Sequence, residues 1–96
     1  MVDLRRYAKN RECDVRLVGI CCANPETSVL AHFRQIGVSG MGQRGPDAIA
    51  CVACVDCHAE IDRRTQKLPA DEARLAHAEG VFRFQAHLIS RGILKW

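Results

Sequence analysis

Three cysteines, a histidine and an aspartate in the middle of the chain have the residue types and spacing of metal ligands. Cys51, Cys54 and Cys57 stand three residues apart. His58 follows the last of them directly, and Asp62 lies four residues further on. Close pairs of cysteines are the usual halves of a tetrahedral structural zinc site. A helix over this stretch would place His58 and Asp62 on one face, where they could offer a nitrogen and an oxygen to a divalent ion.

A four-coordinate zinc site needs two such pairs. The candidates are, upstream, Cys13 with Cys21 or Cys22 and, downstream, Cys51 with Cys54 or Cys54 with Cys57. An iron–sulfur cluster is less favoured, because Ala59 and Glu60 stand where the ferredoxin pattern has its fourth cysteine and a proline. A third interpretation treats the cysteines as small buried hydrophobic residues. Zinc is the preferred interpretation of the three.

The hydrophobic and turn-forming residues predict an α+β domain built from short elements. Helices are expected at residues 4–11 and 55–66, strands at residues 29–34 and 48–53, and a bent extended segment at residues 13–21. A turn at Asn24 and a glycine-rich loop at residues 37–47 would connect them. His32 lies on the first expected strand, between Ala31 and Phe33. A histidine in such a place is more often a buried structural residue than a functional one.

The clearest helix begins at Pro69 or Ala70 and is ended by Gly92. Gly80 weakens its middle by about 1 kcal/mol relative to alanine. The apolar stripe expected to mark this helix consists of Leu75, Ala78, Phe82 and Ile89. The neighbouring apolar residues that widen the stripe, and that could support a homodimer, are Val81, Phe84 and Leu88.

The composition fits one domain, residues 1–96, with a lean core. Hydrophobic residues make up 48% of the chain but aromatic residues only 5%, so a metal or disulfide staple would help it to fold. The N-terminal segment lacks the apolar core of a secretory signal, and no apolar run is long enough to span a membrane. We therefore expect a cytoplasmic protein with no membrane partner, in which clustered thiols bind metal rather than pair with one another.

The charge is mildly basic, with 14 lysines and arginines against 11 aspartates and glutamates. Most of the bases are arginine, whose planar fork suits phosphate. The basic residues that crowd the start of the chain are Arg5, Arg6, Lys9 and Arg11. The candidate nucleic-acid contacts are Arg34, Arg44, Arg63 and Arg64. The alternative for these arginines is a surface role in ion pairs with acids such as Asp56 and Glu60.

The order of these features resembles the HNH nuclease finger, also called the ββα-metal or His-Me finger. In that family a histidine-bearing strand, a loop and a second strand lead to a cysteine pair and a histidine that opens a helix. The segments "REC", "NPETSVLAH" and "CVDCHAEIDRRT" resemble more closely the small nucleases of lambdoid phages and prophages of the YbcO type. This resemblance covers nearly the whole chain and is strongest over residues 11–65.

The resemblance implies a metal-dependent endonuclease that hydrolyses phosphodiester bonds, with DNA as the expected partner. His32 would be the general base, and Asp47, His58 and Asp62 would complete the catalytic site. A Mg²⁺ or Mn²⁺ ion on His58 and Asp62 would bind the scissile phosphate. The ligands of the structural zinc would be Cys13, Cys21, Cys54 and Cys57, which leaves Cys22 and Cys51 as extra thiols.

One position departs from the HNH pattern and favours a second hypothesis. Ala31 stands directly before His32, where many HNH enzymes carry an acid or a histidine that binds the metal. The same zinc-stapled fold could therefore bind DNA or a phage protein without cutting it. The two hypotheses differ in their need for His32 and Asp62, which only the nuclease requires.

Overall fold

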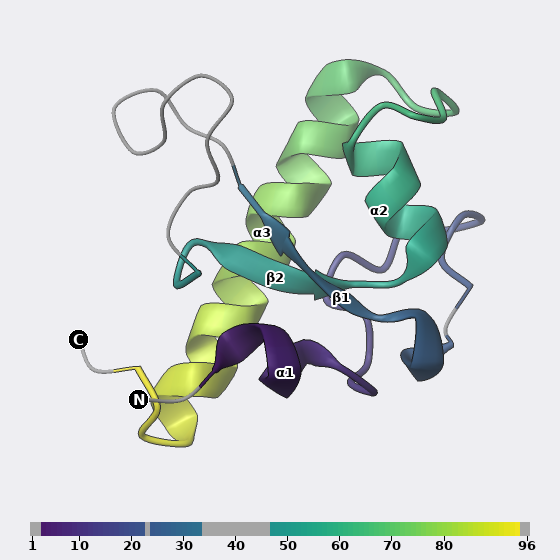
Figure 1. The fold of residues 1–96 in the computed structure, drawn as a ribbon. Coiled ribbons are helices and arrows are strands. Elements are labelled where there is room, and N and C mark those ends of the chain that lie inside the picture. The colour runs from purple at the N-terminus through teal and green to yellow at the C-terminus, as the bar shows by residue number, and fades with distance from the viewer. Residues whose placement is uncertain (1–2, 23, 34–46, 95–96) are drawn as a thin grey trace.

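Two short antiparallel strands lie at the centre of the structure, with helices packed around them (Figure 1). The computed structural model describes residues 3–22, 24–33 and 47–94. Strand β1 (Val29–His32) pairs with β2 (Ala50–Ala53), so that Ala31 is opposite Cys51 and His32 is opposite Ala50. The remaining elements are α1 (Leu4–Ala8), the short 3-10 helix η1 (Pro25–Thr27), α2 (Val55–Ile61) and α3 (Ala70–Ser90). This mixed arrangement confirms the α+β class.

The two faces of the sheet carry different residues. Cys51 points toward α3, because a Cβ atom on Gly80 would lie 3.2 Å from its Sγ. Ala31 lies directly opposite Cys51 and shares this face, where it is 2% exposed. Side chains alternate along a strand, so His32 projects from the opposite face of the sheet. Helix α1 packs against β1, and α3 packs along β2.

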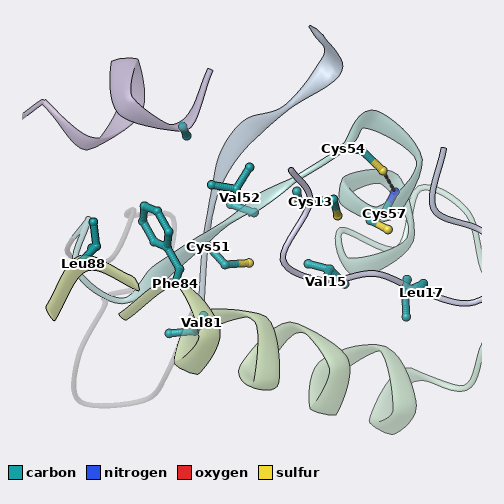
Figure 2. Close-up of a cluster of buried hydrophobic side chains, with 13 residues drawn as sticks. Cys13, Val15, Leu17, Cys51, Val52, Cys54, Cys57, Val81, Phe84 and Leu88 are labelled. Carbon is teal, nitrogen blue, oxygen red and sulfur yellow. Dashed lines mark hydrogen bonds between the residues drawn. The ribbon is translucent and has the colours of Figure 1, made fainter. Parts of the chain in front are cut away.

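The predicted apolar stripe of α3 was wrong. Leu75 and Phe82 are 62% and 67% exposed, respectively. The residues of α3 that are buried are Ala73, His77, Gly80, Val81, Phe84 and Leu88. Val81, Phe84 and Leu88 belong to the core of this chain (Figure 2), so they cannot form the homodimer surface predicted from them.

Gly80 explains why the helix turns this face inward. A methyl group at Gly80 would lie 3.2 Å from the Sγ of Cys51 and 3.3 Å from the carbonyl oxygen of Asp14. Both contacts are shorter than ordinary van der Waals packing, so the absence of a side chain lets α3 approach β2 closely. The residue that weakens an isolated helix therefore lies at a close contact between α3, β2 and the segment that contains Asp14. The predicted end of the helix is confirmed, since Gly92 follows it with a φ of +72°.

The chain before the sheet is less regular than predicted. Helix α1 is capped by the Asp3 carboxylate, which accepts hydrogen bonds from the backbone N–H groups of Arg5 and Arg6. It ends at Ala8, three residues before the predicted end. Residues 13–21 form no strand, since Arg16 has a φ of +53° that breaks an extended segment. This segment turns at Gly19, which has a φ of +76°.

Both predicted strands are present but shorter than expected, since β1 ends at His32 and β2 begins at Ala50, and α2 is also shorter than expected. Residues 34–46, which include the end of the first predicted strand and most of the glycine-rich loop, lie outside the described residues. Helix α2 ends at Ile61 rather than near residue 66, because Arg63 has a φ of +62° and cannot continue it.

Across the described segments, no helix combines the length and apolar character needed to cross a bilayer.

Candidate metal centre and catalytic cleft

Four cysteines from two separate parts of the chain meet at one end of the core. Cys13 and Cys21 come from the irregular N-terminal segment, whereas Cys54 caps α2 and Cys57 lies in its first turn. All four Sγ atoms lie within 4.8 Å of one another, and those of Cys21 and Cys54 are 3.8 Å apart. Sulfurs bound to zinc at about 2.3 Å are separated by about 3.8 Å along the edges of a tetrahedron. The cluster could therefore hold a metal ion such as zinc.

The protonation of the cluster also suits a cation. The pKa of the Cys13 thiol is lowered to about 4, because the Cys57 thiol donates a hydrogen bond to its sulfur, although burial opposes this. The same contact raises the pKa of Cys57, and burial raises it further. Backbone N–H groups of Arg16 and Cys57 donate to the sulfurs of Cys13 and Cys54. Thiols this close can all ionise together only around a cation.

The other two cysteines lie outside the cluster. Cys51 is completely buried in the core beside Gly80, and burial raises the pKa of its thiol. Figure 2 shows it between Phe84 and the group formed by Cys13, Cys54 and Cys57. Cys22 is exposed, and its Sγ lies 3.5 Å from the hydroxyl oxygen of Thr27. The geometry thus selects, from the alternatives left open by spacing, the Cys54–Cys57 pair and Cys21 rather than Cys22.

His32 forms the shortest side-chain contact among the predicted catalytic residues. Its Nε2 lies 2.6 Å from Oδ1 of Asp47, and its side chain is only 9% exposed. An ionised carboxylate can only accept, so in the neutral imidazole Nε2 carries the proton and Nδ1 keeps a lone pair. Asp47 is positioned just before β2, where the side-chain amide of Gln85 donates to the carbonyl of Ala48 at 2.8 Å. The arrangement leaves the imidazole oriented and able to accept a proton at Nδ1.

His58 and Asp62 form the second contact of this group. Residues four apart on α2 meet here, with Nε2 of His58 at 3.3 Å from Oδ2 of Asp62. Adjacent ligands of an octahedral Mg²⁺ ion are separated by about 3 Å, so the two atoms could share one such ion. Among the described residues, the cysteine cluster is the one group of three or more potential ligands close enough to hold a metal. A hard ion here would have two protein ligands and would rely on water and phosphate for the rest.

Two clefts meet at His32 and Asp62. One, of about 410 Å³, is also lined by His58, by Arg5 of α1 and its C-cap Lys9, and by the start of β1. The other, of about 430 Å³, is also lined by Phe33, Ile61, Arg64, Arg74 and His77. The structure thus brings His32, His58 and Asp62 together in one hollow of the surface, and Asp47 reaches it through His32.

Comparison with known proteins places the chain in a family. A family model described as "Putative nuclease YbcO" matches residues 2–93. This chain belongs to the YbcO family. It is 50% identical over 95 residues to "Putative nuclease YbcO" of Escherichia coli K12 and to the protein of the same name from Enterobacteria phage 82, with 99% of each chain covered. The names and sources of these relatives connect the family to nucleases and to phages.

A solved structure has the same fold. It is titled "Structure of a putative bacteriophage protein" from Escherichia coli K-12 MG1655, and it is 44% identical to this chain. The TM-score is 0.80, and the match covers 94% of this chain and all of that one. That solved protein therefore has the same arrangement of short strands and helices as this chain.

The four predicted phosphate-binding arginines have different surroundings. Arg64 lies at the cleft, 61% exposed, with Nη2 at 3.3 Å from Nδ1 of His58 and at 3.7 Å from Oδ2 of Asp62, with which it forms an ion pair. Arg63 is held more tightly by the chain, since its Nη1 donates to Oε2 of Glu60 at 3.2 Å and to the carbonyl of Leu68 at 2.9 Å. The Arg63–Glu60 ion pair is the alternative to phosphate binding that the sequence analysis gave for this arginine. Arg34 and Arg44 lie outside the described residues.

Two buried polar residues near the site were not predicted. The Glu60 side chain is fully buried and accepts hydrogen bonds from the hydroxyl of Thr65 and the backbone N–H groups of Lys67 and Leu68. The pKa of Glu60 is lowered mainly by the hydrogen bond from the Thr65 hydroxyl, although burial opposes this effect. The sequence shows only that Glu60 is an acid in the "EIDRRT" segment. Its burial could not be predicted, because its hydrogen-bond partners come together in one loop only after folding.

His77 is the second buried polar residue near the site. It is 8% exposed on α3, with Nε2 at 3.1 Å from the carbonyl oxygen of Ala31 and its ring edge-on to Phe33 at 5.1 Å. Burial lowers the pKa of His77 below its ordinary value. The hydrogen bond ties α3 to the backbone directly before His32. No spacing in the sequence identifies such a contact.

Proposed function

We propose that this chain is an HNH-type endonuclease that hydrolyses phosphodiester bonds in DNA, with a structural zinc ion in the four-cysteine cluster. The observation that carries the proposal is the His32–Asp47 pair, in which an imidazole that lines the cleft with His58 and Asp62 lies 2.6 Å from a carboxylate. The order of β1 with His32, β2, and α2 with His58 near its start supports the HNH assignment.

His32 would act as the general base. With Nε2–H held by Asp47, its Nδ1 takes a proton from a water molecule as the water oxygen forms a bond to phosphorus. The bond from phosphorus to the 3′ oxygen breaks, and that oxygen gains a proton from solvent. Asp47 stabilises the imidazolium that forms, because its carboxylate faces the ring at hydrogen-bond distance.

His58 and Asp62 would hold a Mg²⁺ or Mn²⁺ ion, which when bound supplies Lewis-acid stabilisation of the phosphate and leaving oxygen. Their 3.3 Å separation supports this role. The contact of Arg64 with Nδ1 of His58 leaves Nε2 as the nitrogen that turns toward Asp62. Four cysteine ligands leave zinc no open position, so the zinc would staple α2 to the N-terminal segment and take no part in hydrolysis.

The test compares nicking of supercoiled DNA by the purified protein and by His32→Ala, each with Mg²⁺ or Mn²⁺. Loss of a general base typically lowers the rate about 10²- to 10⁴-fold. Asp47→Asn serves as a second variant, since it keeps the shape of the side chain and removes its charge. A His32→Ala protein that folds, retains zinc and still nicks at the parental rate would contradict the catalytic assignment.

A second candidate function is a zinc-stapled module that binds DNA without cutting it. The observation favouring it is the small number of protein ligands beside His58 and Asp62. The side chain of Ala31, directly before His32, is buried on the opposite face of the sheet and adds none. This candidate predicts no cleavage on supercoiled, linear or branched DNA, together with salt-sensitive binding that is unaffected by His32→Ala.

A further inference from the structure

The basic start of the chain faces the candidate catalytic cleft with two of its four cations. Arg5 and Lys9 both line the cleft that contains His32, His58 and Asp62. They are four residues apart, so they lie on the same side of α1 and the residue that caps it. Arg6, the other cation of α1, is exposed but does not line either cleft that meets at His32. The helix therefore directs a pair of charges, and not its whole charge, toward this site.

Helix α1 is fixed in place despite its five-residue length. Ala8 is completely buried, and the ring of Tyr7 lies 6.3 Å from that of Phe84 on α3. The hydroxyl of Tyr7 is also 2.7 Å from Nε2 of His87. These anchors come from α3, which forms the core, so the cations of α1 are presented from a packed helix rather than from a loose tail.

The charges of Arg5 and Lys9 are not used within the described fold. Among the described residues, neither forms an ion pair with an acidic side chain. Asp3, the acid nearest to them in sequence, accepts two backbone hydrogen bonds as the helix cap. Asp62 is the one acid that lines the same cleft, and it lies at the α2 side beside His58. The pair is thus available to an anion that enters the cleft.

The cleft on the other side of His32 and Asp62 also carries cations. Arg64 lines it from beyond α2, and Arg74 lines it from α3, with its guanidinium 4.5 Å above the ring of Phe33. Positive charge therefore stands on both sides of His32 and Asp62, with Arg5 and Lys9 at one end and Arg64 and Arg74 at the other.

We propose that Arg5 and Lys9 form a phosphate-binding site for the nucleic-acid strand on one side of the bond to be cut, opposite Arg64 and Arg74 on the other side. This inference rests on the proposed function. A polyanion with regularly spaced phosphates fits this distribution, whereas a mononucleotide would occupy one end only. The substrate class is accordingly a strand that continues past the reacting phosphate in both directions, which is the substrate of an endonuclease.

The test is the salt dependence of DNA binding by Arg5→Gln/Lys9→Gln, made in the His32→Ala protein so that the DNA stays intact. Fluorescence anisotropy with a labelled duplex gives the dissociation constant at several salt concentrations. Loss of two phosphate contacts lowers the slope of log affinity against log salt by about 1.8 for duplex DNA, or about 1.4 for a single strand. Affinity at low salt should fall, and the difference from the parent should shrink as salt rises.

The matched control is Arg6→Gln/Arg91→Gln, which removes the same charge from α1 and from the end of α3 without touching either cleft. It should keep the parental slope. Equal slopes for the two double variants, when the unmodified protein cuts DNA and its His32→Ala variant binds it, would overturn this inference and leave the nuclease proposal standing. An unmodified protein that neither binds nor cuts DNA would overturn both. Circular dichroism and thermal unfolding of each variant check that the overall fold is retained.

Discussion

The cysteine cluster and the histidine–aspartate cleft both take residues from α2 and its caps, yet they differ in almost every physical respect. The cluster gathers four sulfurs, three of them buried, around a space that suits one tetrahedral ion. The cleft offers two ligands and an oriented base on an exposed surface, with cations nearby. A closed set of four ligands favours structure, whereas an incomplete set leaves room for a phosphate and water. In the proposed account, one helix carries the zinc ligands Cys54 and Cys57 at its start, followed directly by His58 and, at its C-cap, by Asp62.

The largest expected effect comes from breaking the staple. Cys57→Ser should lower the zinc content well below one ion per chain and abolish the cooperative thermal transition. Structural zinc supplies on the order of 10 kcal/mol of apparent binding free energy, as large as the stability of a typical small domain. Zinc analysis and thermal unfolding check this, with Cys22→Ser as the control that keeps both. A normal transition in Cys57→Ser would remove the distinction between the two regions.

A smaller effect is expected from the cleft. Asp62→Asn weakens the oxygen ligand beside His58, so nicking should fall about 10- to 100-fold, the range typical when a group that serves a metal site is changed. Higher Mg²⁺ or Mn²⁺ should recover part of the rate, while zinc content and thermal stability stay parental. A rate loss that no metal concentration relieves would assign Asp62 a role other than ion binding.

The pH dependence of stability gives a third test, at the contact that joins α3 to β1. Burial lowers the pKa of His77 from its ordinary value of 6.5, so the folded state holds the neutral ring while the unfolded chain takes up a proton. This contribution is present above pH 6.5 and is lost as pH falls from 6.5 toward the lowered pKa. Urea unfolding between pH 7.5 and 5.5 measures it.

His77→Gln isolates this effect from the acid sensitivity of the thiolates. Glutamine can still donate to the carbonyl of Ala31 but does not titrate. Its stability should fall less steeply with acid than that of the parent over the same range. Identical pH profiles for the two proteins would show that His77 does not control this part of the curve.

Local patterns in the sequence were sufficient for the elements on either side of the site. β-Branched and aromatic residues next to a glycine-rich segment marked the first strand, the glycine after α3 marked its end, and the cysteine spacings limited the zinc ligands to a few sets. These features depend on residues close together in the chain. The choice between Cys21 and Cys22 needed either a family resemblance or the fold.

The features that could not be predicted from the sequence share a different cause. The inward face of α3 is set by how closely Gly80 approaches Cys51 and Asp14, and hydrophobic periodicity gives no weight to glycine or to His77. Glu60 is buried because partners up to eight residues later fold back onto it. The cations of α1 reach the cleft only through the anchoring of Tyr7 on α3. Each depends on contacts that form only when distant segments meet.

The central claim, that one metal is structural and another catalytic, is tested most directly by selective chelation. The protein is treated briefly with EDTA, and zinc content and nicking activity are measured before and after Mg²⁺ or Mn²⁺ is added back. The account predicts that activity disappears and returns with the added ion, while zinc remains near one per chain throughout. Activity that falls only in step with zinc loss, and that only zinc restores, would contradict it.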